Sequence, residues 1–296
     1  MTFSLFVEQV FNGLQLGMLL FLVAVGVTLV FGVMNLVNLS QGALVMMGGF
    51  LLATATKATS SYWLGLPLGI AALIVIAMLI ELLVLRRLYA RPHIDQVLAT
   101  FGLMLMFNEG AVMIWGRDPV FMAIPAALEG SVTLLPGVAY PIYRLAVTIF
   151  AGALGVALHF LISRTRLGML IRAGADKREM IQLLGVDIAF LYLMVFCLGG
   201  VLGGVAGMLL GPISAVTTGM GDPILILALV CVVIGGLGSV GGAFVAAMLV
   251  GMCDTFGRVL LPQALGAGTG QAIANMIVYL VMAAILIWRP AGLASR

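Results

Sequence analysis

Residues 187–211 read DIAFLYLMVFCLGGVLGGVAGMLLG, and this run decides the fold. Beyond its first residue it carries no charge for 24 positions, which is long enough for one helix to cross a bilayer. Gly199, Gly203, Gly207 and Gly211 recur every four residues and therefore share one helix face. Since small residues let helices approach closely in lipid, we interpret this ladder as a packing surface, with ligand contact as the alternative.

The whole chain has the composition of a membrane protein. Of its residues 63% are hydrophobic and only 8% are charged, and 38 are glycine. No soluble core of this length needs so much apolar surface, whereas repeated membrane helices do. The net charge of +3 is no nucleic-acid signature, so we expect no nucleic-acid partner. The composition predicts an all-α integral membrane protein with a single transmembrane domain over 1–296, surrounded by lipid.

Apolar runs of about 20 residues predict a polytopic bundle of about nine transmembrane helices, with eight to ten held open. The segments are 9–33, 41–57, 64–88, 94–115, 141–163, 187–210, 223–236, 240–257 and 271–289. The seventh and eighth are short and joined by GGLGSVGG, so 223–257 is either one broken helix or two helices. The connection 116–140 holds three prolines, which favour irregular extended structure.

Basic residues orient the chain. Arg86, Arg87 and Arg91 follow the third segment, five cations lie between Arg164 and Arg178, and two more end the chain. Because cytoplasmic connections are enriched in Lys and Arg, these regions are expected inside. They alternate correctly if nine segments cross with the N-terminus outside and the C-terminus in the cytoplasm.

The longest polar interruption is 163–187, SRTRLGMLIRAGADKREMIQLLGVD. Asp176 and Glu179 have the spacing of a capping box, and Gly185 suits a helix end, so a short amphipathic helix is predicted over 176–185. At the inner face of the membrane, this helix would offer a contact surface to another protein. The coupling segment 164–186 therefore carries these candidate contact residues: Arg172, Asp176, Lys177, Arg178, Glu179, Met180, Leu183, Leu184 and Gly185.

Two further interruptions, one in each half, indicate a translocation pathway. Irregular backbone at membrane depth must line a cavity or be buried in protein. The first is GVMNLVNLSQG at 32–42, and an ordinary inner-face turn is its alternative. In the second, five glycines within eight residues weaken a continuous helix. The pathway candidates in these interruptions are Asn35, Asn38, Ser40, Gln41, Gly235, Gly236, Gly238 and Ser239.

Ionisable residues inside apolar segments are costly and normally face protein, a partner or water. Glu81 lies near Arg86 and is expected to pair with it. Glu109 lies nearer the outer end and is a candidate for the pathway or for a subunit contact. Asp254 and Arg258 are four residues apart, which favours a local ion pair.

Several kinds of catalytic or metal site have no counterpart in the sequence. The two lysines, Lys57 and Lys177, do not follow a glycine-rich loop as the phosphate-loop motif requires. Gly-x-Ser-x-Gly, HExxH and clustered Cys or His are missing too, so we expect no catalytic residues and no metal site. If ATP drives this chain, a partner must supply the ATP site.

The run 171–209, IRAGADKREMIQLLGVDIAFLYLMVFCLGGVLGGVAGML, together with VIGGLGSVGGAFVAAMLVG at 233–251, resembles the LivH-like permeases of branched-chain amino-acid ABC importers. The stretch 26–50 is also similar to the second-span region of that family. The resemblance covers nearly the whole chain.

The resemblance implies a permease subunit in the inner membrane of a bacterium, and not an enzyme. Its partners would be a second, LivM-like permease, two cytoplasmic ATPases that bind ATP and magnesium, and a periplasmic solute-binding protein. It places the coupling helix of the family on 176–185. The expected cargo is branched-chain amino acids or related amino-acid and amide solutes. A self-contained, ion-coupled transporter or channel that uses Glu81 or Glu109 is the alternative from another class.

Overall fold

The computed structural model describes residues 3–89, 91–135, 138–176, 182–183 and 185–294. Nine apolar helices lie in this part of the chain, and all but the fifteen-residue α10 are long enough to cross a membrane. They are α1 (Phe3–Met34), α2 (Ser40–Thr59), α3 (Tyr62–Ile80), α5 (His93–Trp115), α6 (Ile142–Arg164), α9 (Ile188–Ser214), α10 (Gly221–Gly235), α11 (Val240–Leu265) and α12 (Ala267–Trp288). This confirms the predicted all-α polytopic fold.

The smaller elements lie at the ends of these helices. α3 continues through a π-helical segment, Glu81–Leu85, into α4 (Arg86–Leu88), and α7 (Arg166–Asp176) follows α6. In the connection between α5 and α6, a short 3₁₀ turn at Ala126–Leu128 precedes strands β1 (Ser131–Leu135) and β2 (Val138–Pro141). The two strands pair antiparallel, so part of this connection is a hairpin where the prolines predicted only irregular structure.

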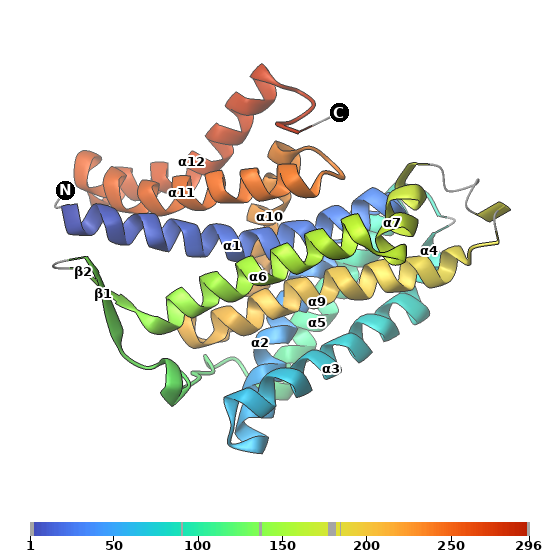
Figure 1. Cartoon of the computed structure of the whole chain (residues 1–296), viewed down its shortest axis with the longest axis horizontal. Helices are drawn as coiled ribbons and strands as arrows, with labels where there is room; N and C mark the ends of the chain where they lie inside the picture. The colour runs from blue at the N-terminus through green and yellow to red at the C-terminus, as the bar shows by residue number, and fades with distance from the viewer. Residues whose placement is uncertain (1–2, 90, 136–137, 177–181, 184, 295–296) are drawn as a thin grey trace.

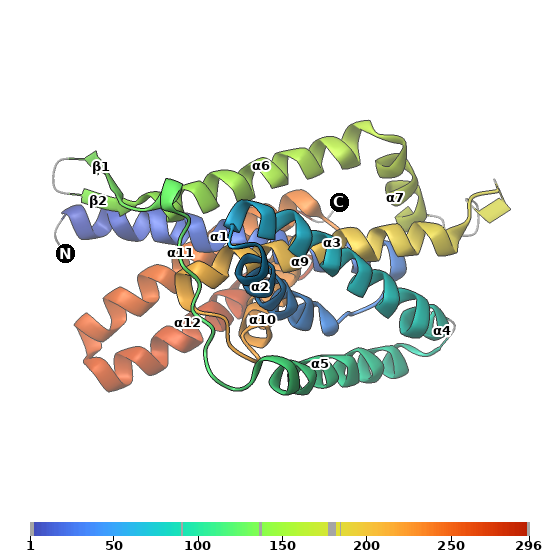
Figure 2. The ribbon, with the colours of Figure 1, turned by 90° about the horizontal axis from the view of Figure 1, so that it is seen from below.

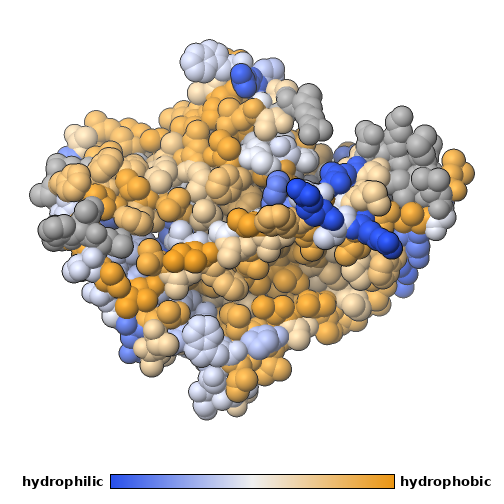
Figure 3. All heavy atoms as spheres, in the orientation of Figure 1, coloured by the Kyte–Doolittle hydropathy of each residue, from blue (hydrophilic) through white to orange (hydrophobic). Residues whose placement is uncertain are grey.

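The helices run between two ends of the molecule. The N-terminus and the β1–β2 hairpin lie at one end, and α4 and α7 lie at the other (Figures 1 and 2). Hydrophobic residues cover most of the face shown in Figure 3, and strongly hydrophilic ones gather near α7. The charges therefore mark one end of the bundle, as expected for a chain with polar connections and an apolar band.

α1, α2 and α9 form the centre of the bundle, and α9 approaches each of the other two where at least one of the paired helices has a glycine. A Cβ added to Gly26 of α1 would lie 2.6 Å from the carbonyl oxygen of Gly199 on α9. One added to Gly48 of α2 would overlap the backbone of Gly204, and one added to Gly207 would overlap the carbonyl of Val45. The ladder on α9 thus lies against both helices, and backbone contact replaces the side-chain layer that separates most packed helices.

The contacts of the first helices are repeated by the last ones. α1 packs against α9, α10 and α11, whereas α9 packs against α1, α2 and α3. α2 contacts α5 as α10 contacts α12, and α2 and α10 contact each other. Five long helices, α1, α2, α3, α5 and α6, precede α9 in the chain. Because this number is odd, the helices that begin with α9 run in the opposite direction to those that begin with α1. The chain thus has the arrangement of an inverted repeat, α1–α2–α3–α5 and α9–α10–α11–α12, with α6 and α7 between them.

Candidate functional site

A cavity of about 560 Å³ lies where three of the predicted segments meet. It brings together the end of α1, the end of α7, the start of α9 and the connection between α10 and α11. Its lining residues are Phe31, Gly32, Val33, Met34, Asn35, Gly174, Ala175, Tyr192, Leu237 and Gly238. Of the sequence-predicted pathway residues, Asn35 and Gly238 line this cavity, and the coupling segment reaches it through Gly174 and Ala175.

The connection between α1 and α2 forms the first wall. Asn35 leaves the helix with φ +51°, a left-handed conformation that asparagine tolerates better than most residues. The side-chain oxygen of Asn38, which is buried, accepts hydrogen bonds from the amide of Ser40 at 3.0 Å and from its hydroxyl at 2.6 Å. This short turn ends the irregular backbone and starts α2.

Gln41 ties this connection to α9. Its Nε2 donates to the carbonyl oxygen of Gly199 at 2.7 Å, and the side chain is fully buried. A Cβ on Gly26 would come within 2.8 Å of this nitrogen, and one on Gly203 would overlap it. The ladder therefore makes room for a side-chain amide as well as for helix backbones. The Oε1 of Gln41 and the Nδ2 of Asn38 are buried, and neither has a hydrogen-bond partner among the described residues.

The connection between α10 and α11 forms a second wall next to the first, since a Cβ added to Gly32 would lie 3.4 Å from the Cα of Gly238. Gly236 has φ +94° and Gly238 has φ +83°, and glycine adopts such values without a Cβ clash. The hydroxyl of Ser239 accepts a hydrogen bond from the amide of Gly242 at 3.1 Å and so caps α11. Gly235 ends α10. The region 223–257 is thus two separate helices, the second of the possibilities that its sequence left open.

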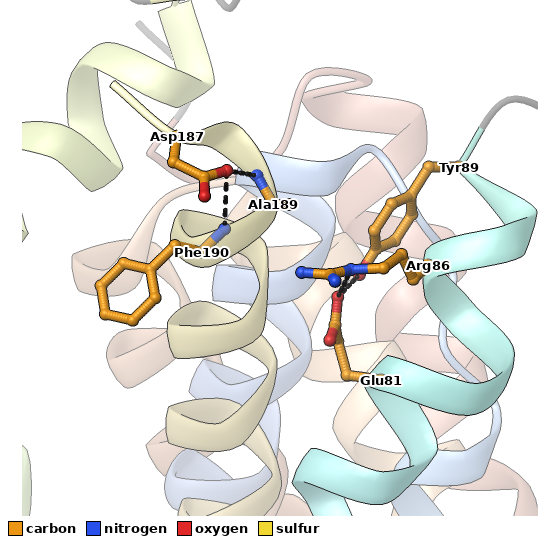
Figure 4. A network of polar contacts seen from close by, with 6 residues as sticks. All are labelled: Glu81, Arg86, Tyr89, Asp187, Ala189 and Phe190. Atoms are coloured by element: carbon orange, nitrogen blue, oxygen red, sulfur yellow. Dashed lines mark hydrogen bonds and ion pairs between the residues drawn. The ribbon is translucent and has the colours of Figure 1, made fainter. Parts of the chain in front are cut away.

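Tyr89, which belongs to a polar network with Glu81 and Arg86 (Figure 4), packs against the cavity-lining residue Tyr192. The Tyr192 ring meets the ring of Tyr89 edge-on, with centroids 4.9 Å apart. Tyr89 donates its hydroxyl to Oε1 of Glu81 at 2.8 Å. Burial raises the pKa of Tyr89 far above its ordinary value, and the Glu81 carboxylate raises it further, so the hydroxyl keeps its proton and remains the donor.

The predicted pairing of Glu81 with Arg86 is present but long, at 3.9 Å. Glu81 is fully buried at the first position of the π-helical segment, and in the part of the chain that the structure describes its second oxygen has no hydrogen-bond partner. The sequence did not identify Tyr89 as a partner of Glu81. The π-helical segment Glu81–Leu85 shifts the helical register, and this shift brings the side chain eight positions later onto Glu81. Asp187 caps the adjacent α9 by accepting from the amides of Ala189 and Phe190 (Figure 4).

The coupling segment differs from its prediction at its start. Asp176 belongs to α7 (Arg166–Asp176), whereas it was predicted as the cap of a later helix, and residues 177–181 after it lie outside the described residues. The sequence did not predict α7. This helix buries the face with Gly168 and Ile171 and exposes the face with Met169 and Arg172. Arg172 of α7 donates a hydrogen bond to the carbonyl oxygen of Ile162 near the end of α6, and this bond joins the two helices.

Only part of the predicted coupling helix can be placed. Leu183 is helical and 88% exposed, and Gly185 has φ +82°, the value that a glycine helix end requires. The remaining predicted contact residues, Lys177, Arg178, Glu179, Met180 and Leu184, lie outside the described residues.

Two acidic residues lie away from the cavity. Glu109 is exposed on α5, while its neighbour Asn108 donates to Asp222 of α10 at 2.9 Å. Asp254 pairs with Arg258 at 2.8 Å, which confirms the predicted ion pair within α11.

Comparisons with known proteins agree with this architecture. The family described as "Branched-chain amino acid transport system / permease component" matches residues 9–287. The chain is 27% identical to the high-affinity branched-chain amino acid transport system permease protein BraD of Pseudomonas aeruginosa, over 98% of this chain and 96% of that protein. It is 24% identical to LivH of Escherichia coli K12, over 99% and 97%, respectively.

A probable branched-chain amino acid transport permease protein LivH of Methanocaldococcus jannaschii is 26% identical, over 94% of this chain and 89% of that protein. No solved structure matches the chain. The family profile covers all nine apolar helices apart from the ends of α1 and α12. The chain therefore belongs to the branched-chain amino acid transport system permease family.

Proposed function

We propose that this chain is a membrane-spanning subunit of an ATP-driven importer that carries branched-chain amino acids or related small amino-acid and amide solutes. The convergence of both interruptions and the coupling segment on one cavity carries this proposal. Irregular backbone beside a cavity is the arrangement that transporters use for a solute path. The names of the relatives support the substrate class.

ATP and magnesium are assigned to partner chains. Because the sequence has no phosphate-loop motif, two cytoplasmic ATPases would bind and hydrolyse ATP. A second, LivM-like permease would complete the membrane part, and a periplasmic solute-binding protein would deliver the solute. The chain would then lie in the inner membrane of a bacterium. Its N-terminus would be outside, and the end with α4 and α7 would be cytoplasmic.

The position of α7 suggests how a partner ATPase would act on the path. α7 is fixed to the end of α6 through Arg172, and its last turn lines the cavity with Gly174 and Ala175. A push on the coupling segment would therefore move one cavity wall directly. This is a rigid-body link between two sites, with the cavity wall as the moving element.

The test is ATP-driven uptake in liposomes that contain this chain and its companion subunits, with a Leu183→Glu substitution. Leu183 is exposed, so the substitution should leave the fold intact and place a charge where the ATPase would dock. We expect at least tenfold lower uptake and lower stimulated ATP hydrolysis, with solute binding by the binding protein unchanged. Ser163→Glu, which adds the same charge at the exposed end of α6, is the matched control.

Unchanged uptake and ATP hydrolysis in Leu183→Glu would overturn the coupling assignment. Robust uptake by the purified chain alone, driven by an ion gradient, would overturn the importer assignment itself and favour a self-contained transporter.

A further inference from the structure

α5 has one face that no other part of the described chain covers. It packs against α2 and lies at the edge of the bundle in Figure 2. Residues at helical spacing on its other face are exposed, and the large apolar ones include Leu98, Phe101, Leu105, Met106, Met113 and Ile114. These apolar side chains alone would be compatible with lipid, but the same face has two further features that are not.

The first feature is a pair of glycines. A Cβ added to Gly102 or Gly110 would meet nothing within 4 Å, in contrast to the glycines at the centre of the bundle. A glycine inside a helix lowers the stability of the helix by about 1 kcal/mol relative to alanine. Gly102 and Gly110 therefore destabilise α5, and in the described part of the chain no close packing offsets this cost. In membranes, small residues on an open helix face are typical of contacts with another helix.

The second feature is Glu109, which projects from the same part of α5. It is exposed, and it lies between the apolar side chains of Met106 and Met113 along the helix. Glu109 lies six positions before Trp115 at the helix end, a distance of about 9 Å along the helix into the apolar band. A carboxylate at this depth is costly unless it faces water or a donor from protein.

We propose that this face of α5 docks a transmembrane helix of a second, non-identical permease chain, which presents a cationic or amide side chain to Glu109. The proposal rests on the proposed function, because it assigns the surface that the companion permease would use. Lipid tails offer no hydrogen-bond donor. The neighbouring Asn108 amide already donates to Asp222.

A second copy of this chain is the less suitable occupant. In a membrane, a two-fold dimer has its axis along the bilayer normal, so both copies of a residue lie at the same depth. Packing α5 against its own copy would bring two Glu109 carboxylates to one level without a donor for either. Like charges in an apolar layer repel strongly, whereas a donor from a different chain satisfies the carboxylate.

The experiment uses a photo-activated benzoylphenylalanine in place of Met106, in native membranes that contain the whole importer. Val75, exposed on α3, is the control position. We expect Met106 but not Val75 to give an adduct with a different permease chain, at a peptide from an apolar span with Lys, Arg, Asn or Gln. Glu109→Lys or Gly102→Leu should lower the yield at least tenfold. Gly268→Leu should not, although a Cβ at Gly268 also meets nothing within 4 Å.

An adduct with a second copy of this chain, with lipid alone, or with a span that has no such donor would overturn the proposal. Gel filtration of the substituted chain verifies that it is folded. ATP-driven uptake in the same membranes separates the two proposals. Uptake that persists alongside a self-adduct leaves the importer function standing and removes only the heteromeric contact.

Discussion

The connection between α1 and α2 and the connection between α9 and α10 occupy equivalent places in the inverted repeat, yet they are held in different ways. Each begins with a non-glycine residue of positive φ, Asn35 at +51° and Ala215 at +48°. The first connection is anchored in the core by the side chain of Gln41. The second is anchored through its backbone, since Val216 exchanges two hydrogen bonds with Val120 of the long connection between α5 and α6.

This difference ties the two connections to different parts of the molecule. The first connection is joined to α9 by a buried hydrogen bond, so a shift of α9 would act on it directly. The second can move with the long connection, which lies outside the helix bundle. We infer that the cavity wall at Asn35 responds to shifts of α9, and that the connection after α9 responds to whatever binds the long connection.

The largest expected effect comes from a contact that both connections share. Gly42 near the start of α2 and Gly221 at the start of α10 touch through their backbones, and a Cβ on Gly221 would overlap the carbonyl of Gly42. Gly221→Val should therefore cost about 3 kcal/mol or more, the upper range for overpacking. Thermal unfolding in detergent micelles measures this cost. Gly110→Val, where the added atoms meet open space, is the matched control, and equal melting temperatures would contradict the shared contact.

Gln41→Leu should have the next largest effect. It removes the donor to Gly199 and leaves that carbonyl with one partner fewer in the core, so a loss of about 1–3 kcal/mol is expected. The same unfolding measurement tests it, together with ATP-driven uptake. A substitution that lowers neither would show that the first connection does not depend on this anchor.

Asp222→Ala tests the corresponding side-chain contact of the second connection. It removes the acceptor of the Asn108 amide, which is only half-buried, so we expect a loss of about 1 kcal/mol. If this loss exceeds that of Gln41→Leu, the proposed contrast between the two anchors is reversed.

The smallest effect should have the opposite sign. Ala215 has φ +48° and ψ +150°, a combination that glycine adopts far more easily than alanine. Ala215→Gly should therefore stabilise the protein by about 1 kcal/mol, after the extra flexibility of glycine in the unfolded chain is subtracted. Asn35→Gly should change the stability less, because asparagine already tolerates positive φ. A destabilised Ala215→Gly variant would show that this backbone conformation is not strained.

Much of the architecture was predictable because hydropathy is a property of consecutive residues. All nine apolar segments became helices, although α1 starts six residues earlier than predicted and α11 extends to Leu265. The Asp254–Arg258 pair followed from spacing on one helix. In contrast, the sequence did not predict α7, to which Asp176 belongs, since a short amphipathic helix at the membrane surface depends on what it packs against.

The candidate site was predictable only in pieces. The sequence marked Asn35, Gln41 and Gly238 as residues of interruptions, but nothing in it placed Asn35 and Gly238 around one cavity. The partner of Gln41 is 158 positions away, and the partner of Glu81 depends on a π-helical register shift. Contacts of this kind need the helices to be assembled before any one of them is defined.

By itself, the amino-acid sequence determined that this chain has nine apolar segments, that glycine-rich or amide-rich stretches interrupt them in both halves, and that it carries no phosphate loop. Those properties reside in local composition and spacing. Only the tertiary structure decided that α9 lies between α1 and α2, that the two interruptions meet at one cavity, and that Glu109 faces outward from the bundle. The physical reason is that the apolar surface of a membrane helix is suited equally to lipid and to protein, so close backbone packing and a few buried polar contacts select its neighbours.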